Sequence, residues 1–371
     1  MEKNSARNIA GSSSIFLDSL RICAAFTVFY IHAFEQWFPS RSHDQNQPGD
    51  LAHAAVIVFF VLSGYVIAHT TISKNRGGTQ YAQARLTRLS SIVIPALLIT
   101  ALVQYLIQHI NPQMLLPYSR GFTPIRYILS GLFINEFWFF SAAPPLNISL
   151  WSLSFEFWYY TIFGLWFFRK PGWRSIFICL ITCLFAGPKI LVMMPIWLSG
   201  YLAYRMPTPA VIAVKRWFFV FVMIFIAGLA IAYLPSMPYI IGYKPLYYAN
   251  QFVTDWIIGI FVAAALWILP TTGGFGLQTK LATWFRNIAD LTFPLYVLHF
   301  PLIVLWRSLF GFTVNDLGQL WLAIVSVLMT SAIIGIVLEK QRFLWSRFFK
   351  WVLNFIKHIF SKGKNSAVNP R

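Results

Sequence analysis

Residues Ser14–Phe34 have the sequence SIFLDSLRICAAFTVFYIHAF, an apolar stretch that also contains Asp18, Arg21 and His32. A helix that crosses a bilayer needs about 20 mainly apolar residues, so this stretch is long enough to span a membrane. Ionisable side chains are costly in hydrocarbon, and their presence here favours a functional site. Helix geometry puts Arg21 and His32 on nearly the same face, about 16 Å apart along the axis. The alternative is that Arg21 pairs with Asp18 while His32 reaches an interface.

The composition of the chain is that of a multi-pass membrane protein. Of its 371 residues, 58% are hydrophobic and 11% are charged, whereas soluble domains carry about 25% charged residues. The net charge of +18 comes from Lys and Arg in short segments between apolar runs, which is typical of topology signals and lipid headgroup contacts. We therefore expect contact with the lipid bilayer and no binding of nucleic acid. Cys23, Cys179 and Cys183 lie within apolar runs without metal-ligand spacing, so no metal site is predicted.

Apolar runs follow one another along the chain and predict an all-α fold. They lie at about 15–34, 52–69, 91–110, 127–140, 151–168, 173–187, 188–204, 217–235, 251–269, 288–306 and 318–338. The run at 127–140 is short and contains Glu136. If this run does not cross, every strong basic cluster falls on the side of the N-terminus, as the positive-inside rule requires. We therefore predict about ten transmembrane helices, a re-entrant or interfacial segment at 127–140, and both termini in the cytoplasm.

The end of the chain differs from the rest, and we divide it into an integral membrane domain, residues 1–340, and a tail, residues 341–371. The tail begins QRFLWSRFFKWVLNFIKHIF, in which Arg342, Arg347, Lys350 and Lys357 share one side of a helical wheel. This pattern predicts a basic amphipathic helix on the anionic cytoplasmic leaflet.

Two groups of ionisable residues are candidates for chemistry. Glu156 lies near the predicted outer end of its run, and His32 ends the first run on the same side. We expect the two to meet, because a carboxylate fixes the tautomer of an imidazole that acts as a base; the alternative is that Glu156 pairs with a structural cation. Arg85 and Arg88 begin the third run. They form either a phosphate-binding pair or a topology signal.

Two further residues leave their roles open. His299 lies near the middle of a run, in the segment LYVLHFP, and structural and functional roles are equally compatible with it. Ser63 and Gly64 lie within FFVLSGYVIA, residues 59–68. For Ser63 we favour helix packing over a nucleophilic role, because small residues let helices approach and no base is close in sequence.

Together these residues resemble the integral membrane acyltransferases of acyltransferase family 3, which O-acylate sugars. The similar elements occur in the family's order, between about residues 15 and 305. They are Arg21 with His32, the run Phe59-Phe60-Val61-Leu62-Ser63-Gly64-Tyr65, the pair Arg85 and Arg88, Trp151-Ser152-Leu153 with Glu156 and Tyr159, and Tyr296 with His299 and Pro301. The family usually has a proline soon after the second arginine, whereas here Pro95 comes later.

The resemblance implies transfer of an acyl group, most often acetyl, from acyl-CoA to a hydroxyl of a cell-surface or lipid-linked polysaccharide, such as lipopolysaccharide or exopolysaccharide. Acyl-CoA is then a co-substrate, no cofactor is permanently bound, and the bacterial cytoplasmic membrane is the expected location. The predicted site comprises His32, Glu156 and Arg21 for catalysis, Arg85 and Arg88 for the donor, and Trp151, Ser152, Tyr159, Tyr65 and His299 for the substrate pocket. Direct transfer and relay through an acyl-enzyme both stay open. The alternative functions are a transporter or flippase of a lipid-linked sugar and a non-catalytic subunit of a polysaccharide assembly machine.

Overall fold

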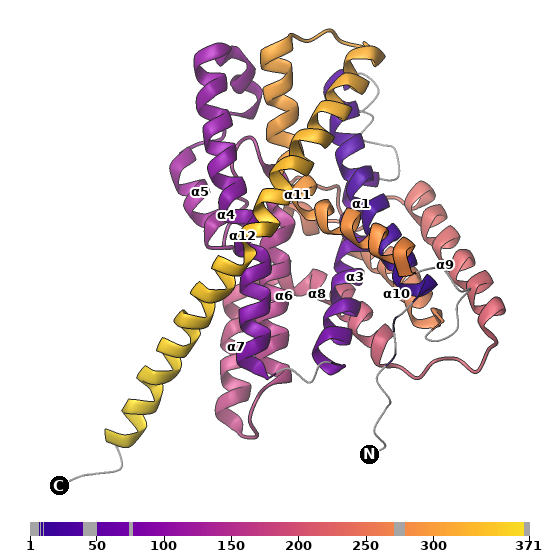
Figure 1. Cartoon of the computed structure of the whole chain (residues 1–371), viewed down its shortest axis with the longest axis vertical. Coiled ribbons are helices and arrows are strands. Elements are labelled where there is room, and N and C mark those ends of the chain that lie inside the picture. Colours follow the sequence, from indigo (N-terminus) through magenta and orange to yellow (C-terminus); the bar gives the residue numbers. More distant parts are fainter. Residues whose placement is uncertain are drawn as a thin grey trace.

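The computed structural model describes residues 7, 9, 11–39, 50–73, 77–270 and 279–366. Within these ranges every regular element is a helix (Figure 1). The elements are α1 (Ser12–Trp37), α3 (Leu51–Ile72), α4 (Gly78–Ile110), η1 (Pro112–Tyr118), α5 (Thr123–Gly131), η2 (Ile148–Leu150), α6 (Trp151–Phe167), α7 (Trp173–Ala186), α8 (Pro188–Arg205), α9 (Ala213–Tyr233), η3 (Tyr247–Ala249), α10 (Phe252–Ile268), α11 (Thr279–Phe310) and α12 (Leu317–Ser366).

Six helices of the described residues are long and apolar enough to cross a membrane. They are α1, α3, α4, α9, α11 and α12. Helices α7 and α8 pass the same test only as a pair, which is bent by 114° at Gly187, and count as one further crossing at most. The predicted all-α, multi-pass fold class is therefore confirmed.

Within the described residues six helices, or seven if the bent pair counts as one, are candidate crossings by length and composition, fewer than the ten expected. The difference comes from runs 151–168, 173–187, 188–204 and 251–269, which form helices of 17, 14, 18 and 17 residues. Helices of this length are close to or below the lower limit of about 17 residues for a 30 Å hydrocarbon layer. The orientation of the two termini stays a prediction.

The segment at 127–140 is not a full crossing, as predicted. Helix α5 has only nine residues, and an irregular segment follows it to η2. Glu136, the residue that interrupts this run, is fully buried, and Lys189 of α8 donates a hydrogen bond to its carboxylate. Lys189 also donates to the carbonyl oxygen of Phe140 at 2.7 Å. This buried ion pair attaches the irregular segment to the start of α8.

Helix α12 passes residue 340 without a break and projects away from the other helices (Figure 1). Its described contacts beyond that point include Gln83 of α4, whose side chain donates to the backbone carbonyl and the hydroxyl of Ser346, both at 3.0 Å. Large apolar residues on this part of the helix, such as Phe348 and Trp351, are exposed. The division of the chain at residue 340 stays a prediction.

Helices α3 and α8 approach each other closely through two glycines. A Cβ atom on Gly64 would lie 2.0 Å from the backbone oxygen of Trp197, and one on Gly200 would lie 1.9 Å from that of Val61. Neither position therefore accepts a larger residue unless the helices separate. This contact confirms that Gly64 serves helix packing.

The outer surface of the bundle is apolar. On α7 and α9 it exposes Leu180, Leu184, Phe218 and Phe225, each more than 60% accessible. A water-soluble protein rarely exposes so many large apolar side chains, so these helices face lipid. One group of polar residues instead lies inside, between α1, α3, α4, α6 and α11.

Candidate functional site

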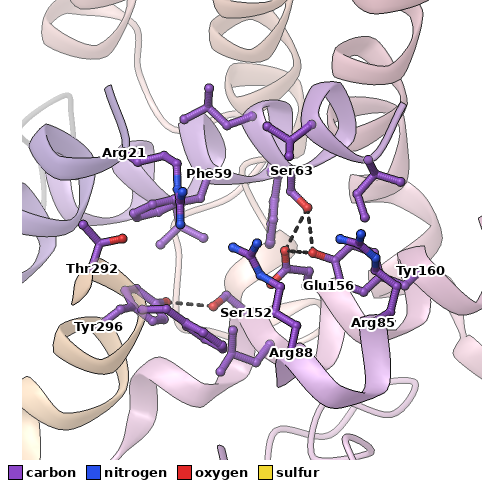
Figure 2. Close-up of a pocket in the computed structure, with 17 residues that line it drawn as sticks. Arg21, Phe59, Ser63, Arg85, Arg88, Ser152, Glu156, Tyr160, Thr292 and Tyr296 are labelled. Atoms are coloured by element: carbon purple, nitrogen blue, oxygen red, sulfur yellow. Dashed lines mark hydrogen bonds between the residues drawn. The ribbon is translucent and has the colours of Figure 1, made fainter. Parts of the chain in front are cut away.

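A cavity of about 90 Å³ lies where α1, α3, α4, α6 and α11 meet (Figure 2). One wall, from α3, is mainly apolar, and the other helices supply most of the polar groups. The polar residues that line it are Arg21, Ser63, Arg85, Arg88, Ser152, Glu156, Tyr160, Thr292 and Tyr296. The cavity thus contains the predicted residues Arg21, Arg85, Arg88, Ser152 and Glu156.

Glu156 is held in place by two hydroxyl groups. Ser63 donates to its Oε1 at 2.8 Å, and Tyr160, one helical turn further along α6, donates to the same oxygen. Trp197 donates its indole N–H to the Ser63 hydroxyl at 3.1 Å. A carboxylate that accepts hydrogen bonds in this way is fixed in position. No base lies close to Ser63 in sequence, but the structure places the Glu156 carboxylate beside it.

Three arginines share the cavity with this one carboxylate. The guanidinium of Arg85 lies 5.8 Å from the ring centre of Tyr81 and 5.7 Å from that of Tyr160. Among the described residues, Arg21 makes a long ion pair with Asp18, 3.8 Å between Nη1 and Oδ1. Arg88 donates no side-chain hydrogen bond to a described residue and extends toward Glu156 (Figure 2). An excess of cations in an enclosed site favours an anionic ligand or a developing negative charge.

His32 lies elsewhere, against His299. Its Nδ1 is 2.8 Å from His299 Nε2, and the two rings are stacked with centres 5.2 Å apart. The expected contact of His32 with Glu156 was therefore wrong. Arg21 lines the cavity with Glu156, and His32 lies about 16 Å further along α1. The two histidines meet because α1 and α11 pack side by side.

The hydrogen bonds of this pair define its tautomers. His299 Nδ1 is 3.2 Å from the backbone oxygen of Leu295, which only accepts, so this nitrogen carries a proton. In the neutral pair, His299 Nε2 then accepts from the Nδ1–H of His32. His32 Nε2 is left without a proton, which is the form a general base requires. His299 thus occupies the position beside His32 that the sequence analysis gave to Glu156.

Tyr296 connects the cavity to the histidines. Its hydroxyl donates to the Ser149 carbonyl at 3.0 Å and is 2.7 Å from the Ser152 hydroxyl. Its ring centre is 6.1 Å from that of His299. Tyr296 therefore lines the cavity and also lies next to His299, while Ser152 lines the cavity beside it. Tyr160 and Tyr296 were absent from the predicted site, although each is one helical turn or less from a predicted residue.

Four predicted pocket residues do not line this cavity: His299, which pairs with His32, and Trp151, Tyr159 and Tyr65. Trp151 is sandwiched between the rings of His53, at 5.5 Å, and Tyr248, at 4.5 Å. Tyr159 is fully buried, and its hydroxyl has no hydrogen-bond partner among the described residues. Tyr65 is fully buried against Tyr204.

A second ionisable pair was missed by the sequence analysis. His53 Nε2 of α3 lies 2.9 Å from Asp255 Oδ2 of α10, and both side chains are buried. The signal was present, because each residue lies in an apolar run where an ionisable group needs a partner. Gln251 donates to the other carboxylate oxygen at 3.0 Å, so the pair is well satisfied and joins α3 to α10.

The fold and site define a multi-pass helical membrane protein with a buried cationic cavity around one fixed carboxylate and a separate histidine pair. A family model described as an acyltransferase domain, that of acyltransferase family 3, matches residues 14–339. The chain therefore belongs to acyltransferase family 3 and is a membrane acyltransferase. Neither the curated proteins nor the solved structures give a match.

Proposed function

We propose that the protein transfers an acyl group, with acetyl as the simplest case, from acyl-CoA to a hydroxyl of a cell-surface or lipid-linked glycan. The observation that carries this proposal is the placement of three arginines around Glu156, with an oriented imidazole pair beyond Tyr296. A thioester donor brings phosphates and develops negative charge on its carbonyl oxygen, and arginine stabilises both. Family membership supports the acyl transfer itself.

In the proposed reaction, His32 Nε2 removes the proton from the acceptor hydroxyl. The alkoxide oxygen attacks the thioester carbonyl carbon, and the resulting oxyanion collapses with release of the CoA thiolate, which takes up a proton. We place the reacting carbonyl near the hydroxyls of Tyr296 and Ser152, because both line the cavity and the Tyr296 ring lies next to His299. Arg21 stabilises the negative charge on the donor, while Arg85 and Arg88 bind it.

The test is release of CoA by purified protein in nanodiscs. Acetyl-CoA and a glycan acceptor are supplied together, and the free thiol is measured. We expect His32→Ala and His299→Ala to lose at least a hundredfold in rate, as is usual for a general base and its orienting partner. His109→Ala is the matched control, because His109 is exposed at the end of α4 and contacts its own helix.

Full activity of His32→Ala would remove the base from the proposal. Movement of the acceptor across the membrane without CoA release would instead indicate a transporter. Mass analysis of the surface glycans of cells with and without the gene identifies the acylated sugar.

A further inference from the structure

A second cavity, of about 470 Å³, opens beside the first between α4, α6 and α7. Its volume is within the range of small-molecule sites, about 300–1,000 Å³. Arg85 and Tyr160 line both cavities. We call this second cavity the donor groove. It adjoins the Glu156 site at these two shared residues.

The donor groove has an apolar middle and a basic end. The apolar walls are formed by Leu86, Leu89, Phe157, Leu165, Phe168 and Ile178. The basic end is formed by Arg169 and Lys170, two exposed residues just after α6. A ligand that matches this surface has an anionic head, an apolar middle and a polar group at its far end.

The length of the groove sets the size of that ligand. From Tyr160 to the end of α6 at Phe167 the helix rises about 10 Å, and from Gly78 to Arg85 on α4 it also rises about 10 Å. Both helices run along the groove, since Gly78, Arg85, Tyr160 and Phe168 all line it. The ligand is therefore elongated and reaches from the basic end to the cavity.

The floor of the groove is held rigidly. Tyr81 lies on Gly164, where a Cβ atom would come within 2.7 Å of its ring. The Tyr81 hydroxyl donates to the backbone oxygen of Tyr160 at 3.0 Å. Arg169 is also oriented, because it donates to the Trp166 carbonyl at 2.8 Å and its guanidinium is 3.6 Å from the centre of the Trp166 ring. Its remaining N–H groups are available to a ligand.

We propose that the donor groove binds the arm of a phosphate-bearing acyl thioester. In this arrangement Arg169 and Lys170 contact the phosphates, the arm lies along the apolar walls, and the thioester reaches Arg85 beside Glu156. This inference rests on the proposed function, and it adds two binding residues and an entry route to it. An anionic phospholipid fits the same basic end less well, because its chain would place a methyl group against the Arg85 guanidinium and desolvate that charge.

The first experiment measures binding of CoA and of pantetheine, which lacks the phosphates, to purified full-length protein in phosphatidylcholine nanodiscs. We expect Arg169→Gln combined with Lys170→Gln to raise the Kd for CoA at least tenfold and to leave the Kd for pantetheine unchanged. Both side chains are exposed, so the double variant keeps its fold. Arg174→Gln is the matched control, because Arg174 is close in sequence but does not line the groove.

A second variant fills the apolar part of the groove. Ala82 lines it, so Ala82→Trp should weaken both CoA and pantetheine at least tenfold. Ala101→Trp, on an exposed position of the same helix, is the control and should bind like the wild type.

The outcomes separate this inference from the proposed function. Wild-type protein that binds no CoA would refute the proposed function itself. If the wild type binds CoA and both groove variants bind it with the same affinity, the donor groove is not the CoA site, although the proposed function stands. If the double variant keeps its CoA affinity but loses a thermal stabilisation that phosphatidylglycerol gives the wild type, the groove is a lipid site and the inference is overturned.

Discussion

Replacement of Gly64 by alanine tests whether the contact between α3 and α8 positions the active site. The added Cβ would lie 2.0 Å from the Trp197 backbone oxygen, whereas carbon and oxygen in such contacts are about 3.3 Å apart or more. The two helices must therefore separate by roughly 1.3 Å at this point. Overpacking of this kind costs about 1–3 kcal/mol, of which the better helix propensity of alanine offsets up to about 1 kcal/mol.

The effect on activity should exceed the effect on stability. Ser63 is adjacent to Gly64 and donates to Glu156 at 2.8 Å, while Trp197 donates to Ser63. A shift of about 1 Å in a catalytic group can lower a rate about a hundredfold. We therefore expect Gly64→Ala to lower acyl transfer by up to about this factor and to lower the Tm by several degrees.

The assay is thiol release from acetyl-CoA, with thermal unfolding in the same nanodiscs. Gly228→Ala is the control, because a Cβ there meets no atom within 4 Å, and it should match or slightly exceed the wild type in Tm. The reasoning is refuted if Gly64→Ala behaves like Gly228→Ala in both measurements.

Three further predictions address the buried pair, the hydroxyl between the two halves of the site, and topology. Lys189→Met leaves Glu136 buried without its cation and should destabilise the protein by about 3–5 kcal/mol in thermal unfolding. Adding Glu136→Gln should restore most of this stability. A single variant as stable as the wild type would contradict the prediction. Tyr296→Phe removes the hydroxyl bonded to Ser152 and should reduce acyl transfer at least tenfold with little change in CoA binding; equal rates would exclude a role in the reaction. Leu116 is 71% exposed. A cysteine placed there by Leu116→Cys in an otherwise cysteine-free chain should therefore react with an impermeant maleimide from outside intact cells; labelling only after lysis would invert the predicted orientation.

The parts of the site that could be predicted from sequence are those signalled by a charge in an apolar run. Arg21, Arg85, Arg88 and Glu156 all line one cavity, because the cost of burying a charge without partners forces such residues to meet in the interior. His53 is also an ionisable residue in an apolar run, so the same rule predicts that it has a buried partner. The short length of segment 127–140 and the glutamate within it likewise predicted that this segment does not cross the membrane.

Partners across helices could not be predicted in the same way. His32 was placed beside Glu156 by counting residues from assumed membrane boundaries, as if each apolar run were a full crossing. In the structure the run that contains Glu156 is a helix of 17 residues that begins after a 3-10 turn, and its depth does not follow from its order in the chain. The contact between His32 and His299 joins residues 267 positions apart, and periodicity carries no information about such a pairing.

The hydroxyls of Tyr296 and Ser152 have a consequence for the membrane as well as for the reaction. A membrane protein with a polar interior must not become a leak for ions or for protons. The bond between these two hydroxyls, 2.7 Å long and buried, joins α6 to α11 next to the ring of His299. We expect this bond between helices to keep bulk water out of the interior at this point, so that a thioester bound in the cavity is shielded from hydrolysis.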